Sequence, residues 1–174
     1  MNGAGTALEW LGSELGIVDA VSRLPEWLEK PGEAALFLNG IAGLGGPFWQ
    51  PDFPRASWGG QPWQKAVAVV ESMAFLLQAN IDEIAKHVLP ARRMRASGGL
   101  RFDGLCRRIA SVSGPCIVAT MPRPRLAGIG YLAAGMPARW NDAASEEVFE
   151  PLPDEAIRRR YARWRGLMRE ATGV

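Results

Sequence analysis

The longest regular hydrophobic pattern in the chain runs from residue 63 to about residue 87. Its apolar positions recur at spacings of three and four residues, and charged or amide side chains separate them. This spacing predicts one long amphipathic helix with a single buried face. The buried positions are expected at 67, 70, 74, 77, 81 and 84, and the surface positions at Glu71, Gln78, Asp82 and Lys86.

Shorter patterns predict that strands and helices alternate along the rest of the chain. Compact apolar or β-capable runs indicate strands at 34–40, 92–97 and 115–121. Helical spacing indicates helices at 5–15, 19–29, 103–112, 126–135 and 154–171. Pro25 is expected to break the second of these helices. From residue 63 onward this order predicts an α/β layer with a parallel sheet.

Many of the glycines and prolines gather at residues 40–62, between the first strand and the long helix. The chain has 20 glycines and 13 prolines, and this segment is too long to be a simple connector. We expect such a loop either to be functional or to pack as a substructure. Phe48 and Trp49 within it are interpreted as core or interface anchors, with ligand contact as the alternative.

Composition and charge narrow the function classes. The 174 residues are enough for one domain with a sizeable core, and the net charge of +2 does not indicate nucleic acid or an anionic membrane as a partner. Glu71 interrupts one of the two longest apolar stretches and the other is too short to span a bilayer. Without a predicted secretory signal, we expect a cytoplasmic protein in which Cys106 and Cys116 are reduced. One histidine and two distant cysteines form no metal-binding pattern.

A glycine pair, Gly98 and Gly99, lies where a predicted strand becomes a predicted helix. Two interpretations are open: a tight turn, or a backbone that a flat or anionic ligand approaches closely. His87 is interpreted as a residue at a helix C-terminus rather than a catalytic base. The basic run at 158–165 is interpreted as the solvated face of an amphipathic helix rather than an RNA or membrane site.

Several segments resemble the C-terminal half of the FGGY carbohydrate kinases, the family of glycerol, xylulose, ribulose and gluconate kinases. In chain order they are "GIAGLGGPFWQPDFPRASWG", "QKAVAVVESMAFLLQ", "SGGLRFDGLCRRIASVSG" and "RLAGIGYLAAG". The start, "NGAGTALEWL", is similar to the family's glycine-then-tryptophan helix near the nucleotide phosphates.

This resemblance implies an α/β fold, a ribonuclease H-like (actin-like ATPase) lobe that is incomplete at its N-terminal hairpins. Residues 1–174 would form the C-terminal, nucleotide-side lobe of an ATP-dependent sugar or polyol kinase. The full enzyme would use ATP and Mg²⁺ to phosphorylate a sugar hydroxyl, and an N-terminal lobe would supply the sugar pocket and the general base. This chain alone is expected to be inactive and to hold no catalytic residue.

The resemblance also implies roles for five residues. Gly98 and Gly99 match glycines whose backbone lies against adenosine. Asp103 matches a small polar residue that contacts adenine, although Asp before an apolar helical run is also typical of an N-cap. Gly5 and Glu9 match a glycine and a polar residue near the phosphates. A carboxylate repels phosphate unless magnesium intervenes, so a solvated helix residue is the alternative for Glu9.

Three positions depart from the family pattern. Arg107 and Ser111 stand where the family usually has Gln and Asp, and Arg125 stands where it usually has an acidic residue. These departures favour the alternative function, a catalytically silent kinase-like module for binding or oligomerisation. The expected partners are an N-terminal sugar-binding lobe, a sugar or polyol and a second copy in a homodimer, with no nucleic acid and no membrane.

Overall fold

The computed structural model describes residues 4–17, 19–30, 32–89, 91–96, 103–114, 117–120, 124–137 and 147–173. The helices are α1 (Ala4–Leu15), α2 (Leu24–Leu28), α3 (Pro62–Ile84), α4 (Asp103–Ser113), α5 (Pro124–Ala133) and α6 (Glu155–Thr172). The strands are β1 (Leu36–Leu38), β2 (Ala56–Trp58), β3 (Arg93–Ala96), β4 (Ile117–Thr120) and β5 (Glu147–Phe149). The predicted helices and strands are confirmed to within a few residues, except that α2 covers only the second half of the predicted helix 19–29, and β2 and β5 are additional.

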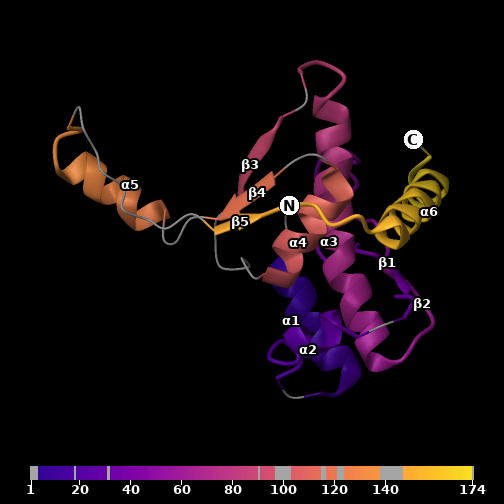
Figure 1. The fold of residues 1–174 in the computed structure, drawn as a ribbon. Helices are drawn as coiled ribbons and strands as arrows, with labels where there is room; N and C mark the ends of the chain where they lie inside the picture. The colour runs from indigo at the N-terminus through magenta and orange to yellow at the C-terminus, as the bar shows by residue number, and fades with distance from the viewer. Residues whose placement is uncertain are drawn as a thin grey trace.

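Helix α3 forms the centre of the molecule, and α1, α2, α4, α6 and β1 all pack against it (Figure 1). It begins with a capping box, in which the Gln61 backbone N–H donates to Gln64 Oε1 at 2.8 Å. Pro62 follows at the first helical turn, where its missing N–H removes no helical hydrogen bond. These local signals explain why the long helix starts where the sequence pattern predicts it.

The three-stranded sheet has the order β3–β4–β5. Strands β3 and β4 are parallel, with Met94 opposite Val118, and this part of the predicted sheet is confirmed. Strand β5 pairs with β4 in the antiparallel direction, so the sheet is mixed rather than purely parallel. Helix α4 lies between β3 and β4 in the chain and packs on β4 and β5.

The glycine- and proline-rich segment 40–62 packs as a substructure, one of its two expected roles. Its second half contains β2, which pairs antiparallel with β1. Leu44 and Gln50 exchange backbone hydrogen bonds of 2.7 and 2.9 Å, and Asn80 of α3 donates to the Gly46 carbonyl at 2.9 Å. Phe48 is buried as a core anchor, whereas Trp49 is 77% exposed, so the core interpretation is wrong for Trp49.

Helix α3 differs from its prediction at two polar positions. Glu71 and Gln78 were expected at the surface, but they are only 1% and 8% exposed. Glu71 meets arginines of α4 and α6, which pattern analysis of one helix does not take into account, and these partners offset the cost of its burial. Gln78 donates from Nε2 to Asp82 one turn further along α3, and its Oε1 is buried without a hydrogen-bond partner among the described residues. Ile84, expected on the buried face, is 57% exposed because it lies at the end of the helix.

The expected break at Pro25 is confirmed, since the predicted helix 19–29 is helical only from Leu24 and Pro25 lies in its first turn. Residues 19–23 precede the helix as turns.

Helix α6 closes the core with the stripe that its sequence predicts. Ile157, Trp164 and Met168 are completely buried, and Tyr161 is half-buried. The Trp164 indole N–H donates to the Phe37 carbonyl of β1 at 3.1 Å. Asp154 caps the helix by accepting from the Ile157 N–H, and Gly173 ends it with a left-handed φ of 71°. The exposed Arg158, Arg159 and Arg163 confirm the amphipathic interpretation of the basic run.

Helix α5 lies apart from the main body in Figure 1. Its small residues predicted close packing, but Ile129 and Leu132 are 63% and 64% exposed, so the prediction is wrong for this part of the helix.

His87 lies in the turn after α3, where its N–H donates to the Ile84 carbonyl, as expected for a C-terminal residue. Within the described ranges, every helix is too short or too polar to cross a membrane.

A cavity beside helix α4

The largest described cavity near a predicted site residue lies between α2, α4 and the segment that leads into α6. It has a volume of about 740 Å³. One face of α4 forms its wall, since positions 104, 107, 108 and 111 repeat at helical spacing. The remaining lining residues are Pro25, Leu28, Glu29, Asp103, Leu152 and Asp154.

Carboxylates outnumber guanidinium groups in this cavity. Glu29, Asp103 and Asp154 face Arg107 and Arg108. Arg107 is partly engaged elsewhere, since its guanidinium lies 5.6 Å from the centre of the Phe149 ring. The lining therefore suits a ligand that offers hydroxyl and amine donors, and it is unfavourable for a phosphate group.

Arg108 forms the floor of the cavity. Its Nη2 donates to the Leu28 carbonyl at 2.9 Å and its Nη1 to the Gly104 carbonyl at 3.2 Å, so it ties α2 to α4. Its Nε is buried without a hydrogen-bond partner and lies 3.6 Å from Glu71 Oε1. Burial lowers the pKa of the Arg108 guanidinium, although the nearby Glu71 carboxylate opposes this shift.

The Glu71 carboxylate lies between two arginines. Arg160 of α6 donates from Nε and Nη2 to both of its oxygens, at 2.8 and 2.6 Å. Arg108 of α4 approaches from the other side. Glu71 thus joins α3, α4 and α6 in one buried network, in which two positive charges share one negative charge.

The predicted site residues do not all lie at the cavity beside α4. Asp103 is the first residue of α4 and lines the cavity. It lies inside the helix, so its charge acts on the first turn and not from the capping position. Gly5 and Glu9 lie on α1, where Glu9 is exposed, and neither lines this cavity. Gly98 and Gly99 lie outside the described residues, as does the side chain of Arg125.

Sequence reasoning missed the roles of Arg108, Glu29 and Glu71. For Glu71 a signal was present, because a single carboxylate inside the apolar run "AVAVVESMAFLL" indicates a buried charge that needs a partner.

Ser111, a departure from the family pattern, has a packing role. Its hydroxyl donates to the Arg107 carbonyl at 2.8 Å and accepts from the Leu152 N–H at 3.3 Å.

The described residues contain no cluster of three His, Cys, Asp or Glu side chains that could hold a metal ion. The acidic residues of the cavity do not form such a cluster either.

The fold is the ribonuclease H-like fold of an actin-like ATPase lobe. The structure superposes on a ligand-bound xylulose kinase from Lactobacillus acidophilus with a TM-score of 0.79 and 18% identity, covering 99% of this chain and 39% of that one. For Plasmodium falciparum glycerol kinase with ADP the TM-score is 0.78 and the identity 17%, covering 98% of this chain and 37% of that one.

The chain also resembles curated carbohydrate kinases in sequence. The chain is 28% identical over 186 residues to glycerol kinase of Methylobacterium nodulans, covering 93% of this chain and 36% of the relative. It is 25% identical over 187 residues to glycerol kinase of Xanthomonas campestris pv. campestris, covering 98% and 38%. No family model matches the chain. These matches fit the C-terminal part of an FGGY carbohydrate kinase and confirm the predicted resemblance. The chain spans a little over a third of the length of these relatives.

Proposed function

We propose that this chain is the nucleotide-side lobe of an ATP-dependent carbohydrate kinase, and that the cavity beside α4 receives the nucleoside end of ATP. The observation that carries the proposal is the position of Asp103. This residue, selected on its resemblance to an adenine contact, begins α4 and lines the cavity. The helix follows β3 of a parallel pair, and ligands of such sheets bind beyond the carboxyl ends of the strands.

The chemistry of the cavity supports a nucleoside more than a phosphate. Its volume of about 740 Å³ lies within the usual range of small-molecule sites. The carboxylates of Asp103 and Glu29 can accept hydrogen bonds from ribose hydroxyls or from the adenine amine. The phosphates would then extend away from this acidic lining, towards the cleft between the two lobes.

In this proposal the chain positions the nucleotide and the reacting groups lie elsewhere. Phosphoryl transfer depends mostly on positioning and on charge stabilisation, and Mg²⁺ would supply part of that stabilisation when bound. An N-terminal lobe would bind the sugar or polyol and supply the general base, and closure of the two lobes would exclude water. The coverage of only about a third of each relative supports a partner lobe of this kind.

Calorimetric titration of the chain with ADP and with adenosine tests the proposal. We expect both ligands to bind, since the cavity would recognise the nucleoside. Asp103→Asn should weaken both about tenfold, the loss of roughly one hydrogen bond to a charged group. Glu14→Gln, an exposed carboxylate on α1, is the matched control and should leave the affinity unchanged.

Two results would overturn the proposal. The first is an absence of binding at millimolar nucleotide, which would favour the silent kinase-like module. The second is an equal affinity for Asp103→Asn and Glu14→Gln. A sugar-dependent ATPase activity of the chain by itself would contradict the assignment of the general base to another lobe.

A further inference from the structure

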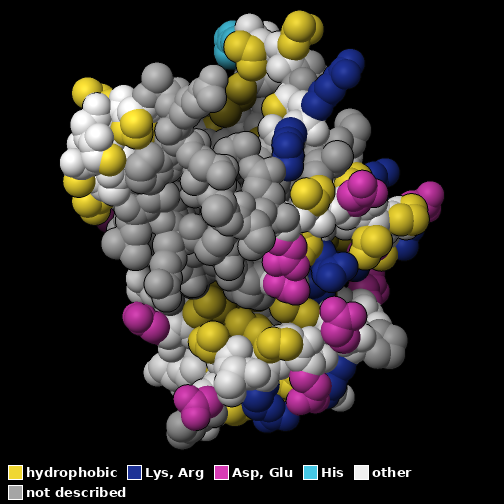
Figure 2. Space-filling model, turned by 60° about the vertical axis from the view of Figure 1, so that its left-hand side comes forward, with side chains coloured by type: hydrophobic (Ala, Val, Ile, Leu, Met, Phe, Trp, Pro, Cys, Tyr) yellow, Lys and Arg dark blue, Asp and Glu magenta, His cyan; other side chains and the backbone are white. Residues whose placement is uncertain are grey.

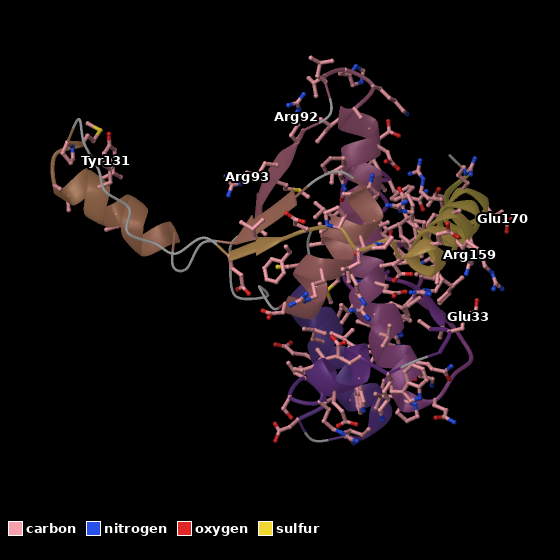
Figure 3. The ribbon with its side chains drawn as sticks, viewed as in Figure 1. Glu33, Arg92, Arg93, Tyr131, Arg159 and Glu170 are labelled. Atoms are coloured by element: carbon pink, nitrogen blue, oxygen red, sulfur yellow. The ribbon has the colours of Figure 1, made fainter. Side chains whose placement is uncertain are left out.

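A second cavity, distinct from the one beside α4, lies between α6, the segment before β1 and the start of α3. Its volume is about 470 Å³. Three arginines of α6 form one wall: Arg159, Arg160 and Arg163. The other walls are formed by Glu33, Ala34, Ala35, Leu36, Gly60 and Gln64. Figure 3 shows Arg159 extending from α6 towards the segment that carries Glu33.

Arg160 is held in a fixed orientation with one edge free. Its Nε and Nη2 donate to Glu71, and this two-pronged pair fixes the plane of the guanidinium. Its Nη1 donates to no group among the described residues, and the side chain lines the cavity. A guanidinium anchored in this way loses little conformational freedom when it binds an anion.

The buried network behind Arg160 carries excess positive charge. Glu71, 1% exposed, is the carboxylate that faces both Arg160 and Arg108, whose side chains are 13% and 17% exposed. Buried charge is costly unless it is paired, so an anion at the open edge of either arginine would be stabilising. Arg108 faces a cavity in which carboxylates outnumber guanidinium groups, whereas Arg160 faces one in which three arginines surround a single carboxylate, Glu33.

The two remaining arginines are available to a ligand. Arg159 and Arg163 are one helical turn apart on α6, so both can reach the same side of the cavity. Arg163 forms no ion pair with a described residue. Arg159 is 3.8 Å from Glu155, but the two side chains are 73% and 87% exposed, so this pair is weak. Gln64 keeps one amide N–H for a ligand, because its Oε1 accepts from the Gln61 N–H and its Nε2 donates once, to the Glu33 carbonyl.

We propose that this cavity is an anion site that binds a small phosphate dianion, either inorganic phosphate or the phosphate group of a monoester. The forked N–H donors of three arginines match the oxygens of a phosphate, and the anion meets the positive charge that Glu33 and Glu71 leave uncompensated. The inference does not depend on nucleotide binding beside α4.

The test is a titration of the full chain with inorganic phosphate and, separately, with methyl phosphate, at constant ionic strength, followed by amide NMR shifts. We expect saturable shifts at residues 33–36 and 159–163. Arg163→Gln and Arg159→Gln should each weaken binding at least fivefold. Arg169→Gln, an exposed arginine on the same helix that does not line the cavity, is the control and should bind as the parent does. Arg160 is left unchanged, since its replacement would leave the buried Glu71 carboxylate without its two-pronged partner and disrupt the site.

The titrations with inorganic phosphate and with methyl phosphate distinguish a site for the free phosphate ion from a site for the phosphate group of a monoester. Saturation by both anions assigns the site to phosphate in general, and saturation by methyl phosphate alone assigns it to monoesters. If neither anion gives saturable shifts in the cavity, the proposal is wrong. It is also wrong if Arg163→Gln, Arg159→Gln and Arg169→Gln bind phosphate with the same affinity, because binding would then reflect general positive charge.

Discussion

Glu71 of α3 and Arg160 of α6 lie 89 positions apart in the chain and form a two-pronged ion pair in the protein interior. Removing one member of such a pair leaves an uncompensated buried charge. Glu71→Gln keeps the shape of the side chain and removes the buried carboxylate that the Arg108 and Arg160 guanidinium groups share. We expect the free energy of unfolding, measured in urea, to fall by about 3–5 kcal/mol.

The exposed pair of Arg159 and Glu155 on the same helix provides the control. Its separation is 3.8 Å and both side chains are largely in water. Glu155→Gln should change the free energy of unfolding by less than about 1 kcal/mol. Equal losses for Glu71→Gln and Glu155→Gln would show that the buried network contributes no more than a surface contact.

Two tryptophans give a second matched comparison. Trp164 is completely buried, stacks beside Tyr161 and donates to the Phe37 carbonyl, whereas Trp49 is 77% exposed. Trp164→Ala opens a large cavity and should lower the free energy of unfolding by about 3–5 kcal/mol. Trp49→Ala should change it by no more than about 0.5 kcal/mol. Thermal unfolding of the two variants side by side measures this difference, and a larger loss for Trp49→Ala would contradict the packing described above.

The loop before β2 contains a glycine, Gly43, in a backbone conformation that residues with a side chain rarely adopt. Gly43 has a φ of 67°, and a Cβ there would fall against the carbonyl of Pro51. Gly43→Ala should lower the free energy of unfolding by about 1–3 kcal/mol. Gly45, two residues later, has open space around it, and Gly45→Ala should be close to neutral. Chemical denaturation compares the two, and an equally small effect for both would argue against this loop geometry.

The hydroxyl of Tyr161 donates a hydrogen bond to Asp82 and links α6 to α3. Burial, together with this bond to the Asp82 carboxylate, raises the pKa of Tyr161 above its ordinary value of 10.0. Above pH 10 the unfolded chain loses this proton while the folded chain retains it, so stability falls as pH rises. Urea unfolding between pH 9 and pH 11 should show this decline, and Tyr161→Phe should make it shallower. An unchanged slope in Tyr161→Phe would exclude this residue as the cause.

The sequence predicted the parts of the fold that depend on local pattern. The spacing of Ile157, Trp164 and Met168 identifies the buried stripe of α6 because one helix face determines it. Strand β2 was not predicted, because its three residues lie within a segment rich in glycine and proline and only pairing with β1 defines the strand. Strand β5 is equally short and depends on β4.

The candidate site was less predictable, since it depends on contacts between distant segments. Asp103 could be selected because its place before a helical run and its resemblance to a family position coincide. Arg108 and Arg160 could not be paired with Glu71, because the pairs join α3 to α4 and to α6 across long sequence separations. Local periodicity therefore assigned Glu71 to the surface, whereas the tertiary structure buries it.

The most direct test of the central claim is an amide NMR titration of the chain with adenosine. If the cavity beside α4 receives the nucleoside end of ATP, saturable shifts will appear at residues 103–111 and 25–29, and Asp103→Asn will reduce the affinity about tenfold. Adenosine carries no phosphate, so Arg159 and Arg163 of the second cavity should not respond. An absence of shifts beside α4 at millimolar adenosine, or shifts that Asp103→Asn leaves unchanged, would contradict the account.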